Sequence, residues 1–173
     1  DTSAIIGADN PDTTSSASFS NGTFTRLAWS TGNPTGYEAK ALFPSADSGK
    51  VYVQFTMSPL TDQVTRIGFV LASNATSITD SNFTVESMYA FFCASNILRV
   101  HWQELFPPSG RNYSAPSAND TFSMEYTNGE IIFKQDTNDG NGFQELSGSR
   151  VTSLASNLVF KLGIISYRSS SLN

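Results

Sequence analysis

The chain has little that catalysis usually needs: among 173 residues there is one cysteine, Cys93, and one histidine, His101. A single cysteine excludes an internal disulfide and a cysteine-based metal cage. Cys93 lies in an apolar stretch, residues 89–94, and we expect it to be a small buried residue of a strand. Any Ser-His or Cys-His pair would have to use His101, and the sequence motifs of hydrolases, zinc proteases and P-loop proteins are absent. We therefore predict a protein that is not an enzyme.

Charge is also scarce, because charged residues make up 14% of the chain, against about a quarter in ordinary globular proteins. Ten Lys and Arg residues face fifteen Asp and Glu residues, so the net charge is −5. This excludes the basic footprint of nucleic-acid binding and disfavours an anionic membrane surface. No apolar run reaches membrane-spanning length, so we expect no membrane insertion. Ser, Thr and Asn supply the polarity instead, which favours an extracellular or virion surface.

Helical periodicity is missing, whereas alternation of apolar and polar residues is widespread. It is clearest in residues 121–127, where Phe122, Met124 and Tyr126 occupy every second position. Asn128-Gly129 follows, and this pair suits the positive φ angles of a two-residue type I′ turn. If residues 130–135 form the return strand, Tyr126 faces Ile131 and Met124 faces Phe133. The sequence therefore predicts a β-hairpin of defined register.

Further strands are predicted along most of the chain, with Gly-, Pro- and Asn-rich turns between them. The predicted strands cover residues 23–29, 37–43, 51–57, 64–72, 97–103 and 158–167, with one or two more in 83–94. Such spacing predicts an all-β chain folded as an antiparallel two-sheet β-sandwich. We expect one domain over residues 21–173. Residues 1–20, rich in Ser and Thr, are expected to form an arm or linker that adds one edge strand at most.

The order of these pieces resembles the concanavalin-like jelly-roll modules of bacterial surface proteins and of phage or viral fibres, a family that includes lectins, glucanases and laminin-G-like domains. The chain is also similar to SPRY domains. The resemblance spans residues 23–170 and rests on segments 29–37, 49–56, 66–71, 120–134 and 162–165. It implies a two-sheet jelly roll with a binding or structural role, often toward glycans. It carries over no site residues, and the Glu-x-Asp-x-(x)-Glu strand of the glucanases does not occur here.

A ligand-binding patch is predicted on the polar side of the 97–103 strand, with help from the long loop that follows. Sugars are bound by aromatic faces together with planar amides and charged groups. The candidate residues are Arg99, His101, Gln103, Asn112 and Tyr113. The alternative is an ordinary solvated sheet face.

Calcium is the one cofactor candidate, since residues 136–142 are rich in oxygen ligands and glycine as a calcium loop must be. The candidate ligands are Asp136, Asn138, Asp139 and Asn141. The segment departs from the EF-hand pattern, because Gly140 stands where Asp or Asn should be and Asn141 where Gly should be. The alternative is a solvated loop that uses these residues for turn geometry.

Three functions are left open by the sequence. The first is a non-enzymatic adhesion or receptor-binding module of a virion, phage fibre or cell surface, with a cell-surface glycan as the favoured partner. The second is a structural subunit, such as a capsid decoration or filament module, that forms a homo-oligomer through its N-terminal arm. The third and least favoured is a glycan-degrading enzyme, because no pair of catalytic carboxylates is evident.

Overall fold

The structure is a computed structural model that describes residues 11–15, 17–26, 38–56, 63–94, 97–101, 113 and 116–168. Within these residues the chain is all β, apart from one 3₁₀ turn, η1 (Val85–Ser87). No helix in the described part of the chain is long and apolar enough to cross a membrane. The all-β class predicted from alternation is confirmed.

Two sheets account for most of the strands, and neighbouring strands in both are antiparallel. The six-stranded sheet has the order β1 (Asp12–Thr13), β4 (Ala39–Ser45), β12 (Phe160–Arg168), β6 (Gln63–Leu71), β7 (Met88–Ala94) and β8 (Ile97–His101). The four-stranded sheet has the order β11 (Gln144–Glu145), β10 (Glu130–Asp136), β9 (Thr121–Thr127) and β5 (Lys50–Thr56). A separate hairpin joins β2 (Ala17–Ser20) to β3 (Thr23–Arg26).

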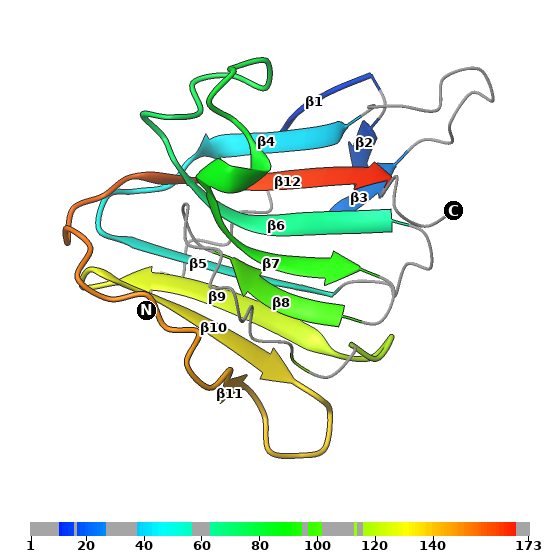
Figure 1. Cartoon of the computed structure of the whole chain (residues 1–173), viewed down its shortest axis with the longest axis vertical. Helices are drawn as coiled ribbons and strands as arrows, with labels where there is room; N and C mark the ends of the chain where they lie inside the picture. The colour runs from blue at the N-terminus through cyan, green and yellow to red at the C-terminus, as the bar shows by residue number, and fades with distance from the viewer. Residues whose placement is uncertain are drawn as a thin grey trace.

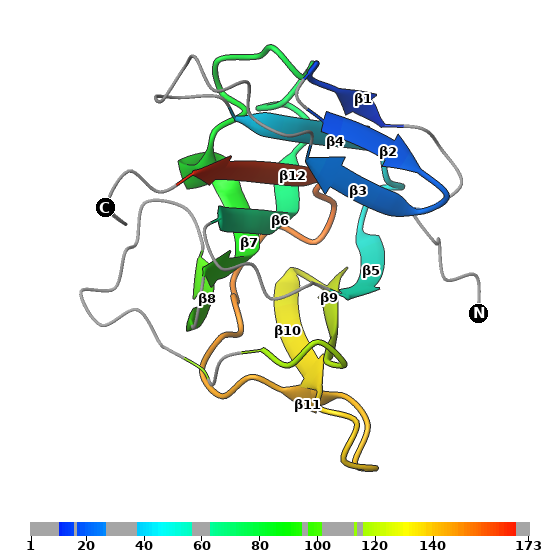
Figure 2. The same cartoon turned by 90° about the vertical axis from the view of Figure 1, so that its right-hand side faces the viewer.

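The two sheets form two layers, as Figures 1 and 2 show from perpendicular directions. The last strand, β12, lies inside the six-stranded sheet between β4 and β6, while β5 crosses to the other sheet. Such crossovers between two packed sheets confirm the predicted jelly-roll sandwich. The β2–β3 hairpin lies beside β4 and places the Phe19 ring 5.2 Å from that of Phe43.

The main core lies between the sheets and is rich in aromatic rings. Phe91 of β7 packs edge-on against Phe122 and Phe133 of the opposite sheet, with ring centroids 5.2 Å apart in both pairs. Tyr126 and Phe160 make a similar contact at 4.8 Å. All five of these side chains are fully buried. Burial of each contributes about 1.5–3 kcal/mol, and the edge-on geometry adds about 0.5–1.5 kcal/mol per pair.

The β9–β10 hairpin has the predicted turn and register. Asn128 and Gly129 have φ angles of 52° and 77°, Ile131 pairs with Tyr126, and Phe133 pairs with Met124. The turn is also packed against the chain that leads into β12, because the Leu154 N–H donates to the Gly129 carbonyl at 2.9 Å. This part of the prediction is confirmed.

The hydroxyl of Tyr126 fixes the same neighbouring segment from inside. It donates to the Ala155 carbonyl and accepts the Leu158 N–H at 3.1 Å. Because the Tyr126 side chain is fully buried, loss of this hydroxyl would leave backbone groups without partners, at about 1–3 kcal/mol. The four-stranded sheet is therefore tied to the segment that delivers β12 to the other sheet.

A second, smaller core lies on the outer face of the six-stranded sheet, under the loop of residues 72–87. Its buried members include Phe83, Met88 and Ile165. Gly163 makes room for the ring, since a Cβ built there would lie 2.7 Å from a Phe83 ring carbon. Phe83 was expected in a strand, but β7 begins only at Met88.

The N-terminal segment contributes more strand than we expected. Asp12 and Thr13 pair with Leu42 and Ala41 as an edge strand of the six-stranded sheet. The β2–β3 hairpin then spans the boundary that we expected between an arm (1–20) and the domain (21–173). Its Asn21-Gly22 turn has φ angles of 50° and 73°, as in the Asn128-Gly129 turn.

We expect Gly129→Ala to lower the melting temperature at least twice as much as Gly22→Ala. Both positions have positive φ, which costs an alanine roughly 1–2 kcal/mol, or about 2–4 °C per kcal/mol in a domain of this size. Only at Gly129 would the new Cβ also meet backbone, 2.3 Å from the Leu154 carbonyl oxygen, whereas nothing lies within 4 Å at Gly22. Thermal unfolding followed by circular dichroism measures both. Equal losses of melting temperature in the two variants would show that residues 151–158 do not pack closely against the Asn128-Gly129 turn.

Candidate functional site

The single thiol is not available for chemistry. Cys93 lies in β7 with 4% of its surface exposed, and burial raises the pKa of the thiol. A nucleophilic or metal-binding cysteine needs the thiolate, which this environment disfavours. The prediction that Cys93 is a buried strand residue is confirmed.

The predicted ligand patch is divided by the structure. Arg99 alternates with the buried Leu98 and Val100, so its side chain lies on the outer side of β8. Tyr113 bridges to Leu98, and its ring packs on the main core while its hydroxyl donates to the Ser147 carbonyl at 3.1 Å. Tyr113 therefore lies at the edge of the sandwich, on the core side of β8 that carries Leu98. The side chain of His101 is not described, and Gln103 and Asn112 lie outside the described residues.

Two residues beside Arg99 were missed by the sequence reasoning. They are Phe92 and Arg66. The guanidinium carbon of Arg99 lies 5.8 Å from the centre of the Phe92 ring, and that of Arg66 lies 5.1 Å from it. The three residues are cross-strand partners on β6, β7 and β8. Only knowledge of the strand register could have shown that Arg66, Phe92 and Arg99 are neighbours. Phe92 lies in an apolar stretch of sequence, so nothing around it indicates a contact with charged residues.

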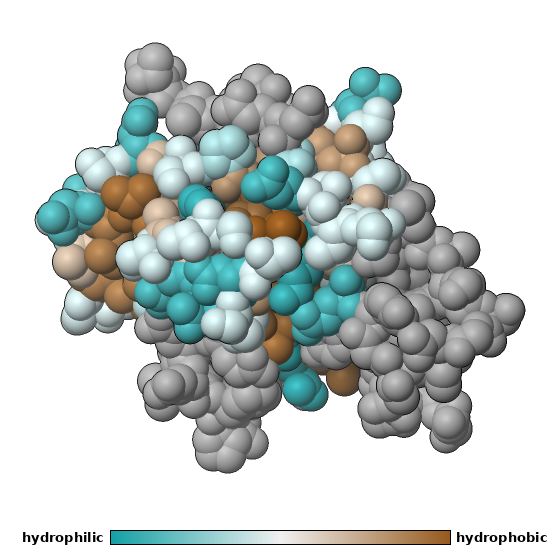
Figure 3. Space-filling model, turned by 90° about the horizontal axis from the view of Figure 1, so that it is seen from above, coloured by the Kyte–Doolittle hydropathy of each residue, from teal (hydrophilic) through white to brown (hydrophobic). Residues whose placement is uncertain are grey.

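Much of this outer face is occupied by the 72–87 loop of the same chain. Three cationic side chains of the sheet donate to its backbone carbonyls: Lys40 to Phe83 at 3.0 Å, Arg66 to Val85 at 3.1 Å and Lys161 to Thr76 at 3.2 Å. The positive charges of this face therefore hold the loop in place. Figure 3, seen from above, shows hydrophilic and near-neutral residues over much of the described surface, with apolar residues at the left, in the centre and at the upper right.

Asp80 organises the loop itself. Its carboxylate accepts the backbone N–H of Asn82 at 2.9 Å, and the N–H and hydroxyl of Thr76 at 3.0 and 2.7 Å. These bonds favour the ionised form and lower the pKa of Asp80 from 3.8 to about 2.

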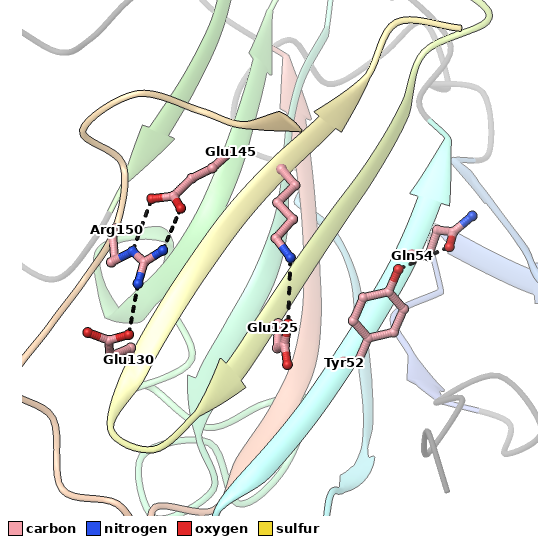
Figure 4. A network of polar contacts seen from close by, with 7 residues as sticks. Tyr52, Gln54, Glu125, Glu130, Glu145 and Arg150 are labelled. Carbon is pink, nitrogen blue, oxygen red and sulfur yellow. Dashed lines mark hydrogen bonds and ion pairs between the residues drawn. The ribbon is translucent and has the colours of Figure 1, made fainter. Parts of the chain in front are cut away.

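The outer face of the four-stranded sheet is different, and we call it the polar sheet face. Figure 4 shows its side chains standing on β5, β9 and β10 with the 144–150 segment alongside. The members are Tyr52, Gln54, Glu125, Glu130, Lys134, Glu145 and Arg150. The five charged side chains keep between 27% and 40% of their surface exposed.

Contacts within the polar sheet face hold its side chains in defined positions. Arg150 donates to both oxygens of Glu145 at 3.0 and 2.5 Å, and to Glu130 at 3.0 Å. The guanidinium lowers the pKa of Glu145, and the two glutamates raise the pKa of Arg150. The Tyr52 hydroxyl donates to the Gln54 amide oxygen at 3.1 Å. A face arranged in this way loses little side-chain entropy when a ligand binds.

The segment predicted to bind calcium forms turns of its own. Asp136 accepts the Asn138 N–H at 2.8 Å and Asp139 accepts the Asn141 N–H at 2.9 Å. The amide of Asn138 also donates to the Asn119 carbonyl. Among the described residues, no three His, Cys, Asp or Glu side chains gather as metal ligands. Calcium binding stays a prediction from the sequence.

Comparison with known proteins shows the fold. No family model and no curated protein sequence matches the chain. The PSpry domain of TRIM65 aligns with a TM-score of 0.50 and 13% identity, over 94% of this chain and 91% of that one. Stonustoxin gives the same score and identity over 87% of this chain and 26% of the toxin chain. The exoplasmic/lumenal domain of VIP36 in a Ca²⁺/Man-bound form aligns at 0.37 and 12% identity, over 94% and 84%. The first two alignments show that the chain shares the β-sandwich fold of these structures, and identities this low say nothing of its family or its ligand.

We expect Asp80→Asn to destabilise the protein at neutral pH and to have no effect in strong acid. Folding lowers this pKa, so the carboxylate stabilises the fold fully above pH 3.8 and loses its contribution as the pH falls through about 2. Melting temperatures of both proteins between pH 7 and 2 should therefore converge at the acid end. Asp47→Asn, at an exposed position just before the turn of residues 48–49, is the control. A gap between wild type and Asp80→Asn that persists at pH 2 would contradict the assignment.

The alternative to a calcium site, a loop that uses these residues for its own turns, predicts that calcium at about 5 mM, above the Kd of weak extracellular sites, leaves the melting temperature unchanged. One oxygen of Asp136 and one of Asp139 already accept backbone N–H groups of the loop. A melting temperature that rises with calcium but not with magnesium, and that no longer rises in Asp139→Asn, would instead establish the site.

Proposed function

We propose that this chain is a non-enzymatic binding module of an extracellular or virion surface, and that its partner is a cell-surface glycan. The binding site that we favour is the polar sheet face. The sequence-predicted patch around Arg99 and His101 stays a second candidate location.

One observation carries this proposal: the two outer faces of the sandwich differ in what covers them. Three cations of the six-stranded sheet, Lys40, Arg66 and Lys161, bind carbonyls of the 72–87 loop. The charged groups of the polar sheet face, in contrast, pair with one another and stay partly exposed. Planar amide, carboxylate and guanidinium groups next to a half-buried tyrosine are what sugar hydroxyls and C–H faces need.

Two further observations bear on the alternatives. The buried, protonated Cys93 supports a non-catalytic role. The structural-subunit alternative relies on an arm that exchanges between copies, yet Asp12–Thr13 pairs with β4 and Ala17–Ser20 pairs with β3 of the same chain. This favours the binding module over the exchanged-arm subunit.

A glycan array, run together with size-exclusion chromatography, tests the proposal. We expect selective glycan binding by a monomer, and we expect Gln54→Ala to raise the Kd about tenfold, as loss of a central contact does. Gln144→Ala is the matched control, because Gln144 is an equally exposed glutamine whose amide donates to Asn141 instead. An array without hits, combined with a concentration-dependent oligomer, would favour the structural subunit.

A further inference from the structure

The charges of the polar sheet face restrict the kind of glycan that it can take. Both edges of the Arg150 guanidinium already carry a carboxylate, since Nε and one terminal nitrogen bond to Glu145 and the other terminal nitrogen bonds to Glu130, which uses three of the five N–H groups. Bidentate pairing of this kind is the geometry by which an arginine would otherwise bind a ligand carboxylate or sulfate. An acidic sugar would have to displace a glutamate that is already in place.

The remaining charges on this face also disfavour an acidic ligand. The Nζ atom of Lys134 lies 3.8 Å from the Oε2 atom of Glu125, beside the group formed by Arg150, Glu130 and Glu145. Lys50 and Asp136 stand on the outward positions at the strand ends. When these two are included, the face has four carboxylates and three cations, in a chain of net charge −5. An anionic ligand therefore meets a surplus of negative charge here.

Hydroxyl groups, in contrast, find partners along β5, β9 and β10 of the polar sheet face, on either side of the partly exposed Ile132. A sugar hydroxyl can donate to the outer oxygens of Glu125 and Glu130 and can accept from Lys134 or from the amide of Gln54. Tyr52 is half-buried and offers part of its ring to the C–H groups of a sugar. Hydrogen bonds between a hydroxyl and a carboxylate or ammonium group are charge-assisted and therefore strong.

The register gives the length of the site. Gln54, Ser123, Lys134 and Glu145 are successive cross-strand partners on β5, β9, β10 and β11. Three inter-strand spacings span about 14 Å, which exceeds a single sugar ring. We therefore propose, as an extension of the proposed function, that the polar sheet face binds an uncharged oligosaccharide chain lying across its strands and discriminates against acidic glycans.

Matched polysaccharides test this inference on the whole chain. Affinity electrophoresis would compare hydroxyethyl cellulose with carboxymethyl cellulose, and dextran with dextran sulfate, alongside the neutral and acidic members of the array. We expect the hits to be neutral, with at least tenfold preference over acidic counterparts and less than twofold change between low salt and about 0.5 M NaCl. Tyr52→Ala should weaken neutral binding about tenfold.

A charge variant makes the test more specific. Glu130→Gln releases one edge of Arg150 while Glu145 keeps the other, so the affinity for acidic polymers should rise relative to the affinity for neutral ones. Glu38→Gln is the matched control, since Glu38 is a glutamate paired at 2.8 Å with Lys40 on the other sheet. Preferential, salt-sensitive binding of acidic glycans by the wild type would overturn this inference and leave the proposed function standing. Neutral binding that Tyr52→Ala leaves intact would overturn it too. Absence of binding to every glycan would overturn both.

Discussion

The packing of the β9–β10 turn against residues 154–158 is the contact on which the sandwich depends most. The backbone of Gly129 accepts a hydrogen bond from Leu154, and the buried hydroxyl of Tyr126 bonds to Ala155 and Leu158. Strand β12 starts two residues later and fills the centre of the other sheet. A short irregular segment, held from both sides, thus links the two layers, and it has almost no hydrophobic periodicity of its own.

Alternation was sufficient to predict the strands that line the main core. Strands β5, β6, β9, β10 and β12 lie close to their expected ranges, because each buries every second side chain between the sheets. The first twenty residues were harder to interpret. Phe19 and Phe24 flank the Asn21-Gly22 turn, and this hairpin signal is hidden by the Ser- and Thr-rich composition around it. The strand expected to include Phe83 was placed too early for another reason. The Phe83 ring belongs to the second core, which lies on the outer face of the six-stranded sheet and exists only in the folded protein.

The candidate site could be predicted far less well than the fold. Arg99 and His101 were placed on the outer side of one strand by alternation alone, and the structure agrees for the backbone of both. Tyr113 was assigned to the same patch, but the chain returns along β8 in a bridge with Leu98 and turns the ring inward. The polar sheet face was missed altogether, because Arg150 meets Glu130 only through folding across 20 positions of sequence.

The burial of Cys93 has a practical consequence for studying this protein. The chain has no other cysteine, and this thiol lies inside the main core with a raised pKa. Maleimide and iodoacetamide reagents react with exposed thiolates, so they should pass over the native fold. A cysteine introduced at an exposed surface position would then be the single reactive handle, suited to carrying a fluorophore or a cross-linker, without any need to remove the native thiol first.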